Sequence, residues 1–325
     1  MVLKIFSMFS GIGGFEYGVQ QSKLNHEFIG HSEIDKYAES IYQNHFHNKN
    51  YGDATLIDTD ELQEFDFLTG GFPCQSFSIS GRRKGFDDTR GTMFFEIARI
   101  LEDKRPRYFL LENVRNLLSH DKGETFKRIL TILTDMGYIV EWDLLNSQNF
   151  GLPQRRERVF IRGYSRRRTS VDEILYFRKN CSETLELNSN NCLQLNNDKK
   201  RYQDGRIYSK DGLSIAMNAR GNNGWYVIDD TKQCPCTQDD TFFAVTTRPR
   251  GMPFRKKQDN YVVYKDMSIR RLTPLECERL QGFPDSWTKY GVDGEVISDT
   301  QRYKCIGNAV STNVITWIIN NMFMS

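Results

Sequence analysis

The chain has 325 residues, of which 38% are hydrophobic and 26% charged, a composition that indicates a globular protein and excludes a disordered one. No apolar run approaches the ~20 residues that a membrane-spanning helix needs, and the N-terminal segment lacks the cleavage site of a signal peptide. The seven cysteines are odd in number and lack disulfide-framework spacing, so we expect the reducing cytoplasm. Cys234 and Cys236 have no second ligand pair at zinc-finger spacing, so we expect no metal.

The net charge of +2 is unevenly distributed along the chain. Residues 165–271 contain 20 Lys or Arg and 13 Asp or Glu, so this segment carries +7 and the rest of the chain −5. A basic segment joined to an acidic remainder is typical of a module that binds a polyanion such as nucleic acid. A solvated, loop-rich surface explains the same count equally well, so charge alone leaves both interpretations open.

In the first half of the chain, short apolar runs alternate with amphipathic segments. Predicted strands cover residues 3–9, 28–30, 65–68, 108–111 and 159–161, and predicted helices cover residues 35–46, 93–103 and 125–136. This alternation predicts βαβ units and a mostly parallel sheet that is covered on both faces. Ligands of such sheets bind beyond the carboxyl ends of the strands, so we expect the site at one edge.

The pattern changes at about residue 165, where Asn, Asp, Lys and Gly become frequent. Short β-like pieces occur at 206–209 and 261–264, and helical spacing returns at 272–281 and 310–322. We therefore predict a smaller, irregular β-rich domain inserted before the last elements of the first domain. The predicted boundaries are residues 1–164 for the first domain, 165–268 for the insertion and 269–325 for the return.

A glycine-rich loop, FSGIGGF at residues 9–15, directly follows the first predicted strand. Glycine permits close approach of a ligand, but the spacing differs from the G-x-G-x-x-G of nicotinamide enzymes, so hydride transfer is disfavoured. Glu33 follows the second strand, where a carboxylate can accept hydrogen bonds from ribose hydroxyls. Asp53 follows a predicted third short strand and suits an adenine amino group. Together they indicate a nucleoside cofactor, although either acid alone also suits a helix N-cap.

Cys74 lies in the segment GGFPCQSFS, after a proline at the end of a strand. The thiolate is the nucleophilic form of cysteine, and nearby cations lower its pKa. Arg82, Arg83 and Lys84 follow in a loop bounded by glycines. A lone cysteine is usually a small buried hydrophobe, but this setting favours a catalytic nucleophile.

Two further segments carry charge next to apolar strands. Glu112 ends the apolar run of LLENV, and a carboxylate there is costly to bury unless it is paired or functional. QRRERVF, at residues 154–160, brings three arginines to the start of a strand. Its alternating charges are typical of a solvated face, yet arginines beside a buried strand also suit the recognition of phosphate or base oxygens.

Taken together, these motifs resemble those of the C5-cytosine DNA methyltransferases. The matching segments follow the family's order and leave out only about residues 165–268; they are FSGIGGF, GGFPCQSFS, GTMFFEIARIL, LLENV, QRRERVF, RRLTPLECERLQGFP and IGNAV. The resemblance implies an α/β fold with a Rossmann-like S-adenosylmethionine-dependent methyltransferase sheet. It also implies a small target-recognition domain, with a DNA cleft between the two.

The resemblance assigns the chemistry to four residues. Cys74 would attack C6 of a cytosine flipped out of duplex DNA, and Glu112 would hydrogen-bond N3 and the exocyclic amine. Arg158 would contact the base oxygen or an adjacent phosphate, with Arg156 in support. C5 would then take the methyl group of S-adenosylmethionine, which leaves S-adenosylhomocysteine, and loss of the C5 proton would release the cysteine.

The resemblance also implies contacts to the cofactor and to DNA. The expected cofactor-binding residues are Phe9, Gly11, Gly13, Gly14, Phe15, Glu33, Ile34, Asp53, Asn308 and Val310. The expected DNA-binding residues are Ser80, Arg82, Arg83, Lys84, Arg90, Arg206, Arg220, Arg248 and Arg250. Arginines of the insertion either read guanine edges or hold phosphates, which leaves the target sequence open. Ile34 stands where relatives often carry an aromatic residue, so stacking on adenine is weakened.

Two alternatives use the same segments. A tRNA cytosine-C5 methyltransferase shares the catalytic motifs, but the Cys-Phe-Thr motif of such relatives is absent. A catalytically silent DNA-binding protein would have no need of Cys74, Glu112 and Arg158 together. The resemblance further implies a prokaryotic cytoplasmic monomer that is associated with the nucleoid through double-stranded DNA and has no membrane contact. A cognate restriction endonuclease would be its functional partner.

Overall fold

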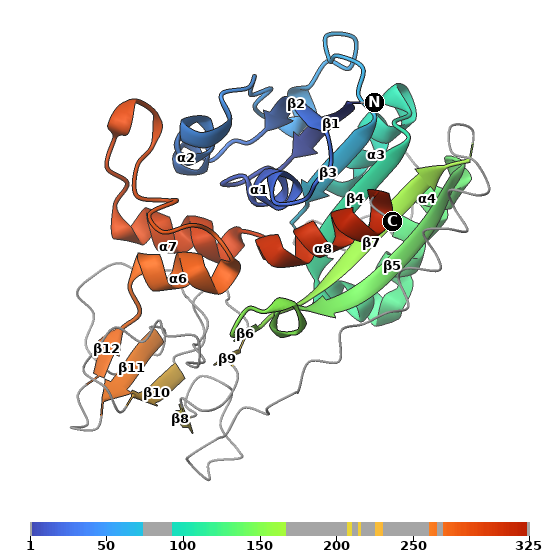
Figure 1. Ribbon diagram of the computed structural model, residues 1–325. Coiled ribbons are helices and arrows are strands. Elements are labelled where there is room, and N and C mark those ends of the chain that lie inside the picture. Colours follow the sequence, from blue (N-terminus) through green and yellow to red (C-terminus); the bar gives the residue numbers. More distant parts are fainter. Residues whose placement is uncertain are drawn as a thin grey trace.

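The structure is a computed structural model of the chain (Figure 1). It describes residues 2–73, 93–166 and 272–323, and between them, in residues 167–271, the backbone of five short strands. Among these residues no helix has both the length and the apolar character needed to cross a membrane. The same residues contain no cluster of three or more potential metal-ligating side chains.

A six-stranded sheet forms the centre of the larger domain. In spatial order its strands are β2 (His26–Ser32), β1 (Leu3–Met8), β3 (Phe67–Gly71), β4 (Tyr108–Val114), β7 (Glu157–Ser165) and β5 (Tyr138–Asn146). The first four strands pair in parallel, whereas β7 runs antiparallel to both β4 and β5. The expected α/β class is confirmed, and the mostly parallel sheet ends in an antiparallel pair that the sequence patterns did not predict.

Helices cover both faces of this sheet (Figure 1). The helices of the described residues are α1 (Gly14–Gln20), α2 (Lys36–Phe46), α3 (Met93–Lys104), α4 (Glu124–Asp135), α6 (Pro274–Gln281), α7 (Asp299–Asn308) and α8 (Thr312–Phe323). Alternate side chains of β4 point to opposite faces, so Phe109 packs into a core with α3 and α4, while Leu110 packs into a core with α1 and α8. A third core joins α2 to α6 and α7.

Short 3₁₀ turns connect several of these elements. Their bounds are Ala54–Leu56, Arg115–Leu118, His120–Gly123, Ser147–Phe150 and Val292–Gly294. The turn at Ala54–Leu56 follows Asp53, which we had expected to follow a third short strand. Asp53 follows no strand of the sheet, because the residues before it form only an isolated parallel bridge between His31 and Asn50.

Strands between residues 207 and 271 form a second, smaller sheet, drawn away from the main one (Figure 1). Its spatial order is β12 (Ile269–Arg271), β11 (Asn260–Tyr264), β10 (Trp225–Asp229) and β8 (Ile207–Ser209). A separate parallel pair joins β6 (Gln154–Arg155), of the QRRER motif, to β9 (Ser214–Ile215). The predicted β-like pieces are therefore strands, while the predicted domain boundaries stay predictions.

Sequence patterns missed α1, α7 and β5. Helix α1 holds two glycines, which lower helix propensity, and it is fixed instead by close packing on α8. A Cβ on Gly18 would lie 2.5 Å from Cβ of Ile315, and Thr316 donates a hydrogen bond of 2.9 Å to the Gly18 carbonyl. Strand β5 lies at the edge of the sheet, and its partly exposed, charged positions mask the strand pattern.

Candidate active site

The glycine loop turns from β1 into α1 at the carboxyl edge of the sheet. Gly13 has φ of +83°, in the left-handed region that favours glycine, and a Cβ there would lie 2.2 Å from a ring carbon of Phe46. Gly14 is also closely packed, because a Cβ there would lie 2.7 Å from Cγ1 of Val310. Above Gly11, by contrast, a Cβ would meet nothing within 4 Å. The loop is thus fixed underneath and open above.

The carboxylate of Glu33 holds this loop against the end of β2. Its Oε2 accepts a hydrogen bond of 2.8 Å from the backbone N–H of Gly11. Its Oε1 accepts bonds of 2.9 Å and 2.8 Å from the N–H groups of Ile34 and Asp35. A carboxylate offers about four acceptor positions, so one remains for a hydroxyl donor such as those of ribose.

Asp53 caps the 3₁₀ turn that follows it. Its Oδ1 accepts hydrogen bonds of 2.9 Å and 2.8 Å from the N–H and hydroxyl of Thr55. The N-cap alternative considered for this residue is therefore realised, and it occupies one carboxylate oxygen. Beside the two acids, Ile34 and Leu56 are 76% and 79% exposed, which leaves apolar surface open to a ligand.

Glu112 and Arg158 form a partly buried ion pair where β4 and β7 meet. Arg158 Nε lies 2.9 Å from Glu112 Oε1, and each side chain is only 14% exposed. The antiparallel register places Val114 opposite Arg158 and Glu112 opposite Phe160. Burial lowers the pKa of Arg158, while the charge and hydrogen bond of Glu112 oppose that shift. The structure thus brings together two residues that sequence reasoning had assigned to one reaction.

The strand that leads to Cys74 runs beside this pair. A Cβ on Gly71 would lie 3.4 Å from Glu112 Oε2 and 3.8 Å from the Phe15 ring. Asn113, almost fully buried, donates a hydrogen bond of 2.8 Å to the carbonyl of Phe72. Sequence reasoning missed Asn113, although it lies inside the LLENV motif. The sequence signal that could have found it is an amide residue directly after the carboxylate at the end of an apolar strand.

Arg156 supports the turn between α7 and α8. Its Nη2 donates to the carbonyls of Ala309 at 2.8 Å and Gly307 at 3.3 Å. Burial lowers the pKa of Arg156 well below its ordinary value, and the charge of Arg158 lowers it further. The same turn carries the expected cofactor residues Asn308, which is exposed, and Val310, which is buried.

Two residues of the C-terminal part hold these segments and escaped sequence reasoning. Gln281, which is fully buried, donates bonds of 3.1 Å to the carbonyls of Ile306 and Ala309. Trp287 donates from its indole N–H to the carbonyl of Ile12 in the glycine loop, at 2.9 Å. Both contacts join motifs that are remote in sequence, which no local pattern reveals.

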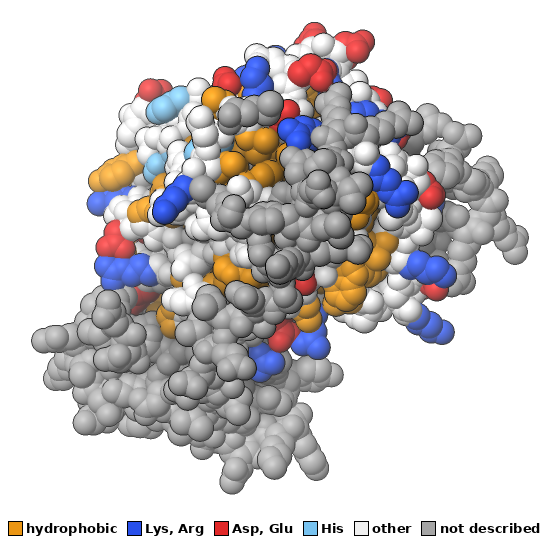
Figure 2. Space-filling model, turned by 45° about the vertical axis from the view of Figure 1, so that its right-hand side comes forward, with side chains coloured by type: hydrophobic (Ala, Val, Ile, Leu, Met, Phe, Trp, Pro, Cys, Tyr) orange, Lys and Arg blue, Asp and Glu red, His pale blue; other side chains and the backbone are white. Residues whose placement is uncertain are grey.

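Several expected residues lie outside the part of the chain that the structure describes. These are Cys74, Ser80, Arg82, Arg83, Lys84, Arg90, Arg206, Arg220, Arg248 and Arg250. Their roles stay predictions. On the face of the described part shown in Figure 2, basic and acidic side chains are interspersed.

Comparisons with known proteins agree on one family. The model of the family "C-5 cytosine-specific DNA methylase" matches residues 3–324. Three similar curated proteins are type II methyltransferases: M1.ScrFI of Lactococcus lactis subsp. cremoris, 37% identical over 98% of this chain and 77% of its own; M.NgoBI of Neisseria gonorrhoeae, 38% identical over 96% and 90%; and M.HhaI of Haemophilus parahaemolyticus, 30% identical over 98% and 94%.

Among solved structures, the S. pombe Dnmt2 methyltransferase superposes with a TM-score of 0.64 at 18% identity. The match covers 98% of this chain and 97% of that one. At so low an identity the likeness shows the fold alone.

Proposed function

The chain belongs to the C-5 cytosine-specific DNA methylases, and on that basis we propose how its residues transfer a methyl group from S-adenosylmethionine to C5 of cytosine in duplex DNA. Because its relatives are type II methyltransferases, we assign it to a restriction–modification system. Its functional partner would be a restriction endonuclease of the same specificity. The enzyme acts as a monomer on bacterial nucleoid DNA.

The observation that carries this proposal is the partly buried Glu112–Arg158 pair beside the strand that leads to Cys74. In the proposed reaction the Cys74 thiolate forms a bond to C6, and the electrons of the C5–C6 double bond move toward C5. Glu112 hydrogen-bonds N3 and the exocyclic amine, and Arg158 keeps Glu112 oriented and meets the base oxygen. After C5 is methylated, loss of its proton and breakage of the bond between sulfur and C6 restore the aromatic ring.

The edge formed by the glycine loop, Glu33 and Asp53 fits the cofactor. The space above Gly11 is open, Glu33 retains an acceptor position for ribose, and Asp53 has a second carboxylate oxygen for the adenine amine. When bound, S-adenosylmethionine supplies an electrophilic methyl group. The Phe15 ring lies near Gly71, as does Glu112, so the proposed cofactor and base sites are neighbours.

Duplex DNA containing 5-fluorocytosine, mixed with S-adenosylmethionine, tests the proposal. Fluorine at C5 blocks the final proton loss, so a covalent protein–DNA adduct should remain on denaturing electrophoresis and disappear in Cys74→Ala. Cys305→Ala is the matched control, because burial raises the pKa of the Cys305 thiol to about 12 and leaves it unreactive. This variant should form the adduct normally.

Three results would contradict the proposal. An adduct that survives in Cys74→Ala would exclude this nucleophile. An adduct with fluorinated tRNA but not with DNA would identify an RNA enzyme. Absence of adduct on both substrates, with folded protein, would indicate a DNA-binding protein without the chemistry.

A further inference from the structure

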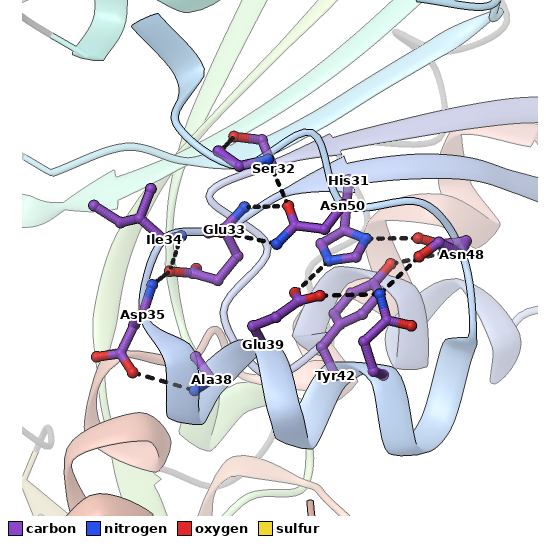
Figure 3. Close-up of polar contacts among 12 residues, drawn as sticks. His31, Ser32, Glu33, Ile34, Asp35, Ala38, Glu39, Tyr42, Asn48 and Asn50 are labelled. Atoms are coloured by element: carbon purple, nitrogen blue, oxygen red, sulfur yellow. Dashed lines mark hydrogen bonds and ion pairs between the residues drawn. The ribbon is translucent and has the colours of Figure 1, made fainter. Parts of the chain in front are cut away.

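Residues 48–53 leave α2 and run beside the end of β2, the edge strand of the sheet (Figure 3). The contact is a short parallel bridge between His31 and Asn50. His31 N–H donates to the Lys49 carbonyl at 3.0 Å, and Tyr51 N–H donates to the His31 carbonyl at 2.8 Å. This added segment, not a strand of the sheet, brings Asp53 to the edge where Glu33 lies.

The side-chain amide of Asn50 joins the two acid-bearing segments directly (Figure 3). Its Nδ2 donates to the carbonyl of Glu33 at 2.9 Å. Its Oδ1 accepts from the N–H of Glu33 at 3.1 Å and from the N–H of Gly52 at 2.8 Å. The one amide of Asn50 therefore binds both the N–H and the carbonyl of Glu33, and also the N–H of Gly52, the residue directly before Asp53.

A second bond ties the same two segments. The Ser32 hydroxyl donates to the Gly52 carbonyl at 2.6 Å. Gly52 has φ of +70°, and a Cβ there would meet nothing within 4 Å. The turn into Asp53 is thus held at both polar groups of Gly52, by Asn50 and by Ser32, while its upper side stays open.

The base of the added segment rests on a buried histidine (Figure 3). His31 is fully buried, with Nδ1 2.6 Å from Asn48 Oδ1 and Nε2 2.6 Å from Glu39 Oε2. Asn48 donates from Nδ2 to the Tyr42 hydroxyl, so its Oδ1 is the acceptor. His31 therefore pairs Asn48, at the start of the added segment, with Glu39 of α2. This pairing anchors the segment to α2.

We propose that Asn50 is the positioning residue that fixes Glu33 and Asp53 relative to each other and so sets the affinity for the nucleoside of the cofactor. The inference rests on the proposed function, in which these two acids bind ribose and adenine. Neither segment can shift without breaking a bond to Asn50. Acceptors that are already in place require less ordering when the ligand binds, so Asn50 acts on affinity without touching the ligand.

A double-mutant cycle tests this role, with S-adenosylhomocysteine binding measured by isothermal titration calorimetry. Glu33→Gln should weaken binding by one to two tenfold steps, because the ligand loses hydrogen bonds to a charged acceptor. Asn50→Ala should weaken binding about tenfold, because the same acceptor is then no longer held in place. In the double variant, Asn50→Ala should weaken binding by less than about a further threefold, because the Glu33 carboxylate that Asn50 positions is already replaced.

Two further measurements separate positioning from general support of the fold. With Asn50→Ala, KM for S-adenosylmethionine should rise while kcat at saturating cofactor and KM for DNA stay within about threefold of the parent values. Asn44→Ala is the matched control, since Asn44 is a half-buried asparagine of α2 for which the described contacts include no side-chain hydrogen bond. It should leave cofactor affinity unchanged.

The outcomes are distinguishable. Unchanged binding in Glu33→Gln would overturn the proposed cofactor site itself. If Glu33→Gln weakens binding but Asn50→Ala does not, or if the two losses multiply in full, Asn50 is not a positioning residue. Should Asn50→Ala melt too low to assay, Ser32→Ala replaces it in the cycle. Ser32→Ala should reduce S-adenosylhomocysteine affinity less than Asn50→Ala would, and it should cause no further reduction when combined with Glu33→Gln. Losses of affinity that combine independently would overturn the inference.

Discussion

Glu33 and Glu112 both stand at the carboxyl edge of the main sheet, yet the fold holds them by different means. Glu33 accepts hydrogen bonds from three backbone N–H groups, whereas Glu112 faces the guanidinium of Arg158 at 2.9 Å. Backbone amides fix a carboxylate without cancelling its charge, and a guanidinium compensates that charge. The carboxylate at the proposed nucleoside site, Glu33, therefore keeps its negative charge. At the proposed catalytic site, Glu112 and Arg158 form a neutral pair that a substrate can rearrange.

Arg158→Ala removes the compensating charge and should have the largest effect. It leaves the partly buried Glu112 without the partner shown here and the base oxygen without a donor, so we expect kcat to fall by about 100- to 1,000-fold. Single-turnover transfer of a labelled methyl group at saturating S-adenosylmethionine measures this. Arg155→Ala, in the same motif but 54% exposed, should keep near-normal turnover, and equal losses in both variants would refute a specific role for the pair.

Arg156→Ala sharpens the comparison, because this buried guanidinium donates to backbone carbonyls. The Gly307 and Ala309 carbonyls lose a charged donor, so we expect the free energy of unfolding to fall by roughly 2–3 kcal/mol. Urea denaturation measures it. A change below about 0.5 kcal/mol, within the range of ordinary surface substitutions, would mean that Gln281 alone holds the turn.

Ile34→Trp strengthens the nucleoside edge. Ile34 is exposed beside Glu33, and an aromatic ring there can stack on adenine, so we expect S-adenosylhomocysteine affinity to rise by about three- to tenfold. Calorimetric titration measures the change. Leu56→Trp, at an equally exposed position after Asp53, is the comparison. The same gain there would indicate unspecific apolar contact and not stacking at the proposed site.

The smallest effect concerns pH and the support beneath Glu33. Burial alone would raise the pKa of Glu39, but hydrogen bonds from His31, Gln43 and Asn50 hold it below its ordinary value. A lowered carboxyl pKa stabilises the fold above the unfolded value and loses that contribution as pH falls through the folded value. Stability should thus decline below about pH 4.5, and Glu39→Gln should flatten that decline in urea denaturation. An unchanged pH profile in the variant would contradict this.

The sequence predicted best what local pattern determines. The four parallel strands and five of the seven helices that the structure describes were expected, because periodicity and turn residues encode them within a few positions. Glu112 and Arg158 were assigned to one site by family resemblance, and their partly buried contact agrees with it. The roles given to Cys74 and to the DNA-binding arginines concern residues outside the described part and stay predictions.

The structure adds what depends on contacts between remote segments. Trp287 reaches the glycine loop from 275 positions away, and Gln281 reaches the turn after α7 from the helix before it. Asn50 binds Glu33 across 17 positions. Asparagine and glutamine side chains carry no periodic signal, and their importance arises only when the fold surrounds them with backbone groups that need partners.

The packing of α8 on α1 has a consequence for the order in which the protein matures. Helix α1, which follows the glycine loop, is covered by residues 312–323, which the ribosome adds after residues 165–268. During synthesis the first domain must wait with an apolar face uncovered. We expect ribosome-bound chains stopped at residue 311 to be cut by protease within residues 1–73, and released full chains to resist. Methylation competence would then begin only once translation has passed α8.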